Sequence, residues 1–138
     1  MKLIRLLLLG SALICGNTFA AEMVKIEGGS YRPLYLKKET SLIKVKPFQL
    51  DKYPVTNAEF AEFVNTHPQW QKGKISSRHA EKAYLKHWVK NGSNSFAPKA
   101  SELKHPVTNV SWFAANAYCV SKGKRLPTID EWEFAGLA

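Results

Sequence analysis

The sequence predicts an α+β fold, and three observations support that prediction. Short alternating segments separated by turns occupy residues 22–55, which is typical of half-buried strands. Helix-start patterns followed by apolar residues at helical spacing occur three times after residue 55. A content of 45% hydrophobic and 12% aromatic residues excludes a disordered chain, and 138 residues correspond to about one domain.

The strand prediction rests on period-two alternation. Residues Met23–Ile26 follow an alternating pattern of apolar and polar side chains, and the turn signal Gly28-Gly29 comes after them. Residues Ile43–Lys46 alternate up to Pro47, and Phe48–Leu50 resume the pattern. We therefore expect short strands joined by turns in this part of the chain.

The first helix is predicted from a capping box, Thr56-Asn57-Ala58-Glu59. In this pattern the threonine hydroxyl accepts from the amide three residues on, and the glutamate reaches back to the cap. An apolar stripe at positions i, i+3 and i+4 follows, and His67-Pro68 ends the helix. The stripe consists of Phe60, Phe63 and Val64.

Two further helices are predicted nearer the C-terminus. Ser111 is a suitable N-cap, and Gly123 is the residue type that often follows a helix end. A second capping box, Thr128–Glu131, starts the last helix behind Pro127. The core side of the earlier helix is formed by Ala114, Ala115, Tyr118 and Cys119, and Trp132 and Phe134 follow the later cap.

Residues 68–106 are the least regular part of the sequence. Trp70, Tyr84 and Trp88 lie there among Gly, Ser, Asn and Pro residues, and 91–98 has the composition of a loop. We expect a long surface connection, and an insertion that faces a substrate is the alternative.

Residues 1–20 have the composition of a secretory signal peptide. A positive start and a short apolar core precede the small residues Thr18 and Ala20. The alternatives are a buried N-terminal helix, or a lipoprotein acylated at Cys15, which the bulky Ile14 disfavours. No apolar run reaches the roughly 18–20 residues of a membrane span. We therefore predict a periplasmic or secreted protein without a membrane span.

No catalytic, cofactor-binding or metal-ligating residue is assigned from a local motif. The histidines His67, His79, His87 and His105 lack the spacing of a helical zinc site. His79-Ala80-Glu81 matches half of a zinc deaminase signature, but the Pro-Cys-x-x-Cys half is absent. A Gly-rich phosphate loop and a Gly-x-Ser-x-Gly turn are also absent. We interpret the histidines as surface or hydrogen-bonded side chains.

The net charge of +9 has two interpretations. Nucleic-acid binding is one, but the cationic residues are scattered and a secreted chain rarely meets nucleic acid. We therefore favour solvated faces and expect no nucleic-acid partner, while an anionic surface or partner stays open.

Removal of residues 1–20 would leave Cys119 as the single cysteine. Such a cysteine is either buried and inert or paired with a cysteine elsewhere. Its position on the apolar side of a helix beside Tyr118 disfavours a nucleophilic role, because apolar surroundings raise the pKa of a thiol.

Four stretches in order resemble the formylglycine-generating enzyme family, also called the sulfatase-modifying factor family. They cover nearly all of residues 23–135 apart from 65–105. The stretches are MVKIEGGSY (23–31), PFQLDKYPVTNAEF (47–60), PVTNVSW (106–112) with AYC (117–119), and GKRLPTIDEWEF (123–134).

The resemblance implies a loop-rich, C-type-lectin-like fold of which residues 21–138 form the N-terminal part. It implies that Arg125, Glu131 and Trp132 support the core through buried polar contacts. Enzymes of this family oxidise a sulfatase cysteine to formylglycine, with oxygen and copper held by two cysteines of the C-terminal half. This sequence ends before that half and matches neither copper ligand, so whether the chain is an enzyme stays open.

Two departures from the family pattern suggest a divergent branch: no residue matches the copper-binding pair, and Pro33-Leu34-Tyr35 stands where the family usually has Met-Gly. Cys119, by contrast, matches a scaffold cysteine that some members link to the C-terminal half, which would explain the single thiol. Divergent relatives include non-heme iron enzymes of thiol-histidine synthesis, a siderophore-tailoring group, and accessory proteins encoded beside copper nitrite reductases. The secretion signal and the segment Tyr84–Trp88 favour the last group.

We therefore expect the N-terminal part of a protein whose full-length form oxidises a cysteine or related substrate, or assists maturation of a secreted enzyme. The partner would be a secreted protein such as a sulfatase or a metalloenzyme, with copper or non-heme iron held outside this chain. The alternative is a non-catalytic accessory or binding module on the same scaffold, for example one linked to copper nitrite reductase. For the 138-residue chain itself we expect no activity and marginal folding.

Overall fold

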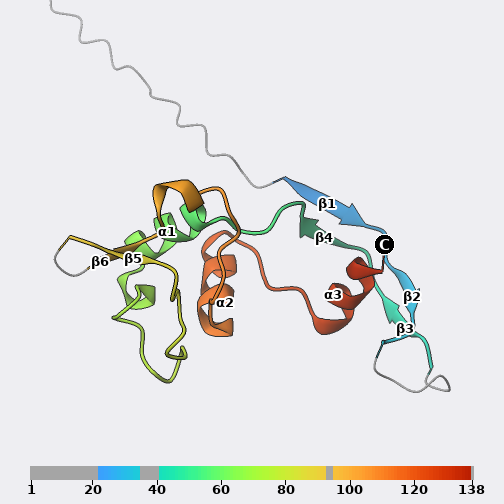
Figure 1. Cartoon of the computed structure of the whole chain (residues 1–138). Helices are drawn as coiled ribbons and strands as arrows, with labels where there is room; N and C mark the ends of the chain where they lie inside the picture. Colours follow the sequence, from blue (N-terminus) through green and yellow to red (C-terminus); the bar gives the residue numbers. More distant parts are fainter. Residues whose placement is uncertain (1–21, 35–40, 93–94, 138) are drawn as a thin grey trace, which may run out of the picture.

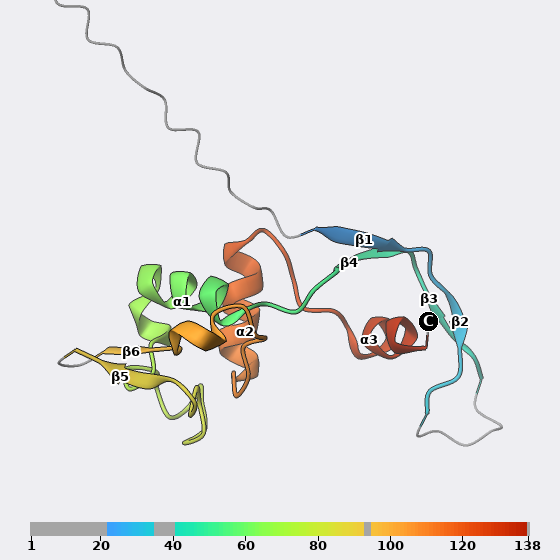
Figure 2. The ribbon, with the colours of Figure 1, turned by 45° about the horizontal axis from the view of Figure 1, so that its top comes forward.

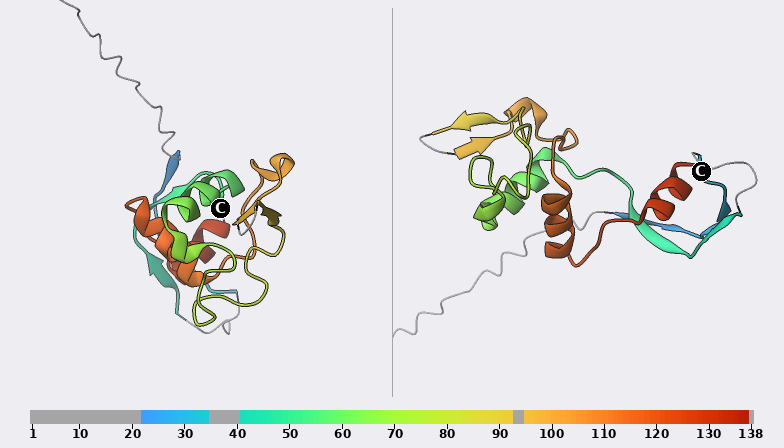
Figure 3. Two further views of the ribbon diagram at one scale, coloured as in Figure 1. Left: turned by 90° about the vertical axis from the view of Figure 1, so that its left-hand side faces the viewer. Right: turned by 90° about the horizontal axis from the view of Figure 1, so that it is seen from below.

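The computed structural model describes residues 22–34, 41–92 and 95–137. The described residues form two lobes that are joined by two extended connections, and the views from other directions agree (Figures 1, 2 and 3). Helices and short two-stranded sheets occur together, so the predicted α+β class is confirmed. The predicted signal segment 1–20 lies outside the described residues.

The first lobe, called the ribbon lobe, consists of two antiparallel strand pairs and one helix. β1 (Met23–Ile26) pairs along its whole length with β4 (Phe48–Asp51). β2 (Gly29–Tyr31) pairs with β3 (Ile43–Val45). The helix α3 (Ile129–Gly136) lies beside this second pair (Figure 2). The alternation in the sequence therefore predicted β1, β3 and β4, whereas β2 begins at Gly29, which was expected in a turn.

Tyr31 anchors α3 to the ribbon. Its hydroxyl donates to Asp130 Oδ1 at 3.0 Å, and its ring meets Phe134 edge to face at 6.0 Å between centroids. Burial, together with the Asp130 carboxylate, raises the pKa of Tyr31 to about 12. The phenol is therefore a neutral donor at physiological pH.

Gly28 makes the close turn between β1 and β2 possible. Its φ of +74° lies in the left-handed region, and a Cβ atom would lie 2.5 Å from the carbonyl oxygen of Val45. Only glycine fits this position without moving the neighbouring backbone.

The second lobe, called the helical lobe, contains the two ten-residue helices and a β-hairpin. The cap residues predicted from the sequence are confirmed for both helices: Thr56 and Glu59 form a capping box, and the Ser111 hydroxyl accepts from the amide of Ala114. Gly123 follows the second helix with φ +69°, as predicted. The elements are α1 (Asn57–Thr66), η1 (Pro68–Trp70), β5 (Val89–Asn91), β6 (Ser95–Ala97), η2 (Ala100–Glu102) and α2 (Trp112–Ser121).

The core of the helical lobe is aromatic. The ring of Phe60 lies 5.8 Å from that of Tyr118 and 6.4 Å from that of Trp88, centroid to centroid. These spacings are typical of favourable aromatic pairs. The buried cluster consists of Phe60, Phe63, Val64, Tyr84, Leu85, Trp88, Ala114 and Tyr118.

The prediction of a surface connection over 68–106 is wrong in its central part. Tyr84, Leu85 and Trp88 are buried in the core, because three large apolar side chains close together have no other way to leave water. The expected loop at 91–98 is also wrong in part, since β5 and β6 form an antiparallel pair there.

Backbone and ionic contacts hold the connections between the lobes. The amide of Val107 donates to the Val55 carbonyl at 2.9 Å. Lys124 Nζ donates to Asp51 Oδ1 at 2.5 Å and joins β4 to the segment after α2. Among the residues described, no helix is long and apolar enough to cross a bilayer.

Candidate functional site

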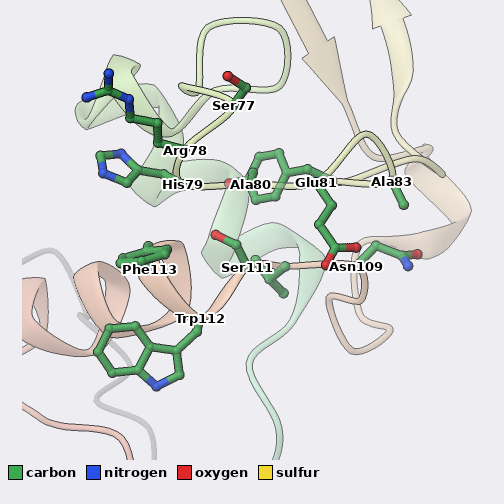
Figure 4. A pocket seen from close by; sticks show the side chains of 12 residues that line it. Ser77, Arg78, His79, Ala80, Glu81, Ala83, Asn109, Ser111, Trp112 and Phe113 are labelled. Carbon is green, nitrogen blue, oxygen red and sulfur yellow. The ribbon is translucent and has the colours of Figure 1, made fainter.

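A groove of about 560 Å³ opens between segment 77–84 and the start of α2. Figure 4 shows the side chains of both walls, with His79 above Phe113 and Glu81 directed toward Asn109. One wall is the turn-rich segment Ser77–Tyr84, and the other is Asn109–Phe113. We take this groove as the candidate functional site because it combines exposed aromatic rings with hydrogen-bonding groups.

The aromatic part of the groove is a series of adjacent rings. Trp112 is 64% exposed and Phe113 46% exposed, and their centroids lie 5.5 Å apart with the planes nearly perpendicular. His79 lies 5.1 Å from Phe113 on one side and 5.9 Å from Trp70 on the other. Large exposed rings that gather beside a hollow are typical of interaction sites.

The polar part of the groove offers both donors and acceptors. Arg78 and Glu81 are exposed on one wall. On the other wall, Asn109 has a left-handed φ of +55°, and its carbonyl accepts from the amide of Leu85 at 2.8 Å. Among the residues described, neither Arg78 nor Glu81 has an ion-pair partner. Both charged groups are therefore available to a ligand.

Tyr84 forms the buried end of the first wall. Its hydroxyl donates to the carbonyl oxygen of Trp70 at 2.8 Å. Burial raises the pKa of the Tyr84 phenol well above its usual value. The side chain is therefore a fixed, neutral part of the wall and is no candidate for proton transfer.

A buried asparagine of α1 joins the helix to the segment that contains the first groove wall. Asn57 Oδ1 accepts from the indole N–H of Trp88 at 3.0 Å, and His87 Nε2 lies 3.2 Å from the same oxygen. Asn57 Nδ2 donates to the carbonyls of Glu102 and His105 at 3.0 and 3.3 Å. One side chain thus connects α1 to the middle and to the C-terminal end of the irregular segment 68–106, and no motif in the sequence indicated this role.

The histidines are structural or lie at the surface, as predicted, where contacts define their roles. His67 Nδ1 lies 3.0 Å from the Phe63 carbonyl, and His87 contacts Asn57. His79 belongs to the groove. Within the described ranges, no group of three or more His, Cys, Asp or Glu side chains could hold a metal ion.

Cys119 has the properties expected of an inert thiol. Burial raises its pKa, the Asp51 carboxylate raises it further, and Lys124 opposes this change. Since the thiolate is the reactive form, a raised pKa disfavours nucleophilic chemistry. The raised pKa therefore disfavours a nucleophilic role for Cys119, and pairing with a cysteine outside this chain stays a prediction.

The expected buried contacts of Arg125, Glu131 and Trp132 are only partly present. Arg125 donates two hydrogen bonds to Glu131 at 2.7 and 2.6 Å, and this bidentate contact lowers the pKa of Glu131 to about 2. The Arg125 side chain is 62% exposed and Trp132 is 66% exposed. Burial of these two side chains was a wrong expectation, because no described segment covers the outer side of α3.

The exposed ring pair at the start of α2 was not predicted from the sequence. Trp112, Phe113 and Val120 are exposed opposite the core side of α2, where Ala114 and Tyr118 are buried. A helix that is apolar on both sides is the signal that could have revealed this second face.

Comparison with known proteins gives one family. The profile of the sulfatase-modifying factor enzyme 1-like domain matches residues 15–138. An inactive C-alpha-formylglycine-generating enzyme 2 of Bos taurus is 32% identical over 94% of this chain and 53% of its own length. The formylglycine-generating enzyme of Bos taurus is 33% identical over 67% of this chain and 31% of its own length.

A third relative is named for a different activity from the one in the names of the first two. The hercynine oxygenase of Mycolicibacterium smegmatis is 30% identical over 72% of this chain and 25% of its own length. The chain therefore spans about half the length of the first of these relatives, and a smaller part of the other two.

Proposed function

The chain belongs to the sulfatase-modifying factor family, and from this premise we propose that it is part of a secreted or periplasmic protein that acts on a polypeptide. The full-length form oxidises a cysteine or a related substrate, or assists the maturation of a secreted enzyme such as a sulfatase or a metalloenzyme. Within it, this chain supplies scaffold and a surface that holds the polypeptide.

The groove is the single observation that carries this proposal. Trp112 and Phe113 offer exposed rings to an apolar side chain, and Glu81 and Asn109 offer acceptors to backbone N–H groups. A polypeptide segment has both kinds of group. The complete domain would have the C-type-lectin-like arrangement, which the α+β composition and the order of the four motifs support.

We place copper or non-heme iron, the metals that the family resemblance implies, outside the described part of this chain. Among the described residues no suitable ligand cluster exists, and burial favours the protonated form of the Cys119 thiol. These side chains do not fit the metal, so no oxidative step is assigned to them. Their part in the reaction is to bind and orient the polypeptide.

A non-catalytic accessory module is the second candidate. Relatives from Bos taurus and Mus musculus carry the name inactive C-alpha-formylglycine-generating enzyme 2, at 32% and 33% identity. A groove that binds a polypeptide without metal ligands around it would serve such a module equally well. Maturation of a copper nitrite reductase is one task of this kind.

The deciding experiment uses the protein expressed from its complete gene. We expect copper-dependent oxygen uptake with a cysteine-containing peptide, and mass spectrometry should detect conversion of the cysteine. Trp112→Ala should raise the KM for the peptide and leave kcat nearly unchanged, because the ring contributes binding alone. The exposed Trp132 of the other lobe gives the matched control, Trp132→Ala, which should change neither constant.

Two outcomes separate the candidates. If no cysteine peptide supports oxygen uptake but peptides still bind in the groove, the accessory function is correct. If peptides are oxidised and Trp112→Ala leaves their KM unchanged, the groove is not the binding surface and its assignment is wrong.

A further inference from the structure

Most of the net positive charge of this protein comes from one segment, because few acidic residues accompany its cations. Residues 68–106 contain eight Lys and Arg side chains and two Glu side chains. The segment therefore has a net charge of +6, out of +9 for the whole chain. The structure shows that this segment is folded onto the core through Tyr84, Leu85 and Trp88, so its charges have a fixed location.

Several of these charges lie on or next to the first wall of the groove. Arg78 lines the groove, and Lys82 lies between the lining residues Glu81 and Ala83. Lys74, Arg78, Lys82 and Lys86 are all exposed and have no ion-pair partner among the described residues. Arg78 on the wall and the unpaired lysines beside it outnumber Glu81, so the potential on this side of the groove is positive.

Lys72 has a different, structural role. Its Nζ donates to the carbonyls of Lys86 and Trp88 at 3.2 and 2.8 Å, and it lies 4.7 Å from the ring of Phe96. It therefore fixes the shape of the basic segment, and Lys99 pairs with Glu102 at 3.8 Å, while Lys74, Arg78, Lys82 and Lys86 have no such partner among the described residues.

The opposite wall adds no negative charge. Asn109–Phe113 contains no ionisable side chain, and the first turn of α2 contains no acidic residue. The N-terminal end of a helix carries a partial positive charge. Glu81 is thus the single anionic side chain that lines the groove.

From these charges and the exposed rings, we infer that the groove binds an acidic polypeptide segment that carries an aromatic or aliphatic residue. The apolar residue packs on Trp112 and Phe113, and the flanking Asp or Glu residues face Arg78 and Lys82. The inference rests on the proposed function only in taking the groove as the binding surface; it adds the chemical class of the partner.

A polypeptide fits the groove better than a nucleic acid or an anionic membrane. A phosphate backbone carries charge at every step and would meet the Glu81 carboxylate. A peptide can instead place a backbone N–H group at Glu81 and acidic side chains on either side. The hollow of about 560 Å³ also suits an inserted side chain more than a flat bilayer surface does.

The test measures binding of a short acidic synthetic peptide with a central phenylalanine, by titration calorimetry on the full chain at low and physiological salt. The comparison peptide has every acidic residue replaced by lysine. The double variant Arg78→Glu/Lys82→Glu should weaken binding of the acidic peptide by about tenfold or more at low salt. Trp112→Ala should weaken it by about fivefold or more.

Charge reversal at a remote site gives the matched control. Lys44→Glu/Lys46→Glu changes the net charge equally, but on the ribbon lobe. It should alter affinity by less than about twofold, since distant charges are screened by salt. The far-ultraviolet circular dichroism of every variant should equal that of the parent chain.

The inference is overturned if the lysine peptide binds as tightly as the acidic one, or if both charge-reversal variants weaken binding equally. It is also overturned if a short DNA duplex or phosphatidylserine vesicles bind more tightly than the peptide. Oxygen uptake by the complete protein is measured separately. Its failure contradicts oxidation and leaves this result unaffected, whereas oxidation that is indifferent to acidic residues contradicts the inference alone.

Discussion

The two lobes differ in how they bury their helices. In the helical lobe, α1 buries Asn57, Phe60, Phe63 and Val64. In the ribbon lobe, α3 has the same kind of capping box but buries no residue. The same capping signal therefore starts a helix in both lobes, while burial of that helix depends on which other segments pack against it. A stable core in this chain exists where α1, α2 and the irregular segment meet.

Truncation of a core ring should produce the largest difference between the lobes. Phe60→Ala should lower the free energy of unfolding by about 3–5 kcal/mol, because it removes a buried ring and leaves a cavity. Trp132→Ala, at an exposed site of α3, should change it by less than about 0.5 kcal/mol. Urea denaturation followed by circular dichroism measures both. If Phe60→Ala does not fold, Phe60→Leu should show a smaller loss in the same direction.

Substitutions of Asn57 test whether buried hydrogen bonds stabilise the helical lobe as much as its aromatic rings do. Asn57→Ala should destabilise the chain by about 2–3 kcal/mol, because it leaves the buried indole N–H of Trp88 without an acceptor. Asn57→Asp keeps that acceptor but turns a carboxylate oxygen toward the carbonyls of Glu102 and His105. It should also destabilise. Equal stability of Asn57→Asp and the parent chain would show that the donated bonds contribute little.

Substitution of Gly28 and of Gly123 separates backbone strain at a left-handed φ from a steric clash of the new Cβ atom. Gly28→Ala in the ribbon lobe should cost more than about 2 kcal/mol, because the new Cβ would lie 2.5 Å from the carbonyl of Val45. Gly123→Ala has a similar φ but no atom within 4 Å, so it should cost about 1 kcal/mol. Thermal unfolding gives both values. A larger loss at Gly123 would contradict the steric explanation.

The smallest expected effect concerns acid stability of the ribbon lobe. The pKa of Glu131 is lowered from 4.5 to about 2, chiefly by the Arg125 hydrogen bonds. Stabilisation from this carboxylate is therefore complete above pH 4.5 and is lost as the pH falls toward 2. Glu131→Gln should flatten the dependence of unfolding free energy on pH in this range.

Arg125→Gln provides the control for that prediction. It removes the main cause of the lowered pKa and should flatten the same part of the pH profile. If Glu131→Gln flattens the profile and Arg125→Gln leaves it steep, the bonds from Thr128 rather than Arg125 hold the carboxylate ionised.

Local patterns predicted local structure well. The capping boxes at Thr56 and Thr128, the cap at Ser111 and the turn at Gly28 all formed as expected. In each case the interacting groups are within a few residues of one another, so the sequence contains both partners. The groove was not predicted, because its walls are separated by more than twenty residues of sequence and no motif joins them.

The sequence by itself determined the α+β composition, the starts of the three helices and the strands β1, β3 and β4, because capping and alternation act between near neighbours. The tertiary structure alone decided that Tyr84, Leu85 and Trp88 enter the core. It also decided that Asn57 binds the middle and the C-terminal end of the segment 68–106, and that Trp112 is exposed beside the wall that carries Arg78. Burial and long-range hydrogen bonds depend on which distant segments meet, and the chain's local patterns do not encode that choice.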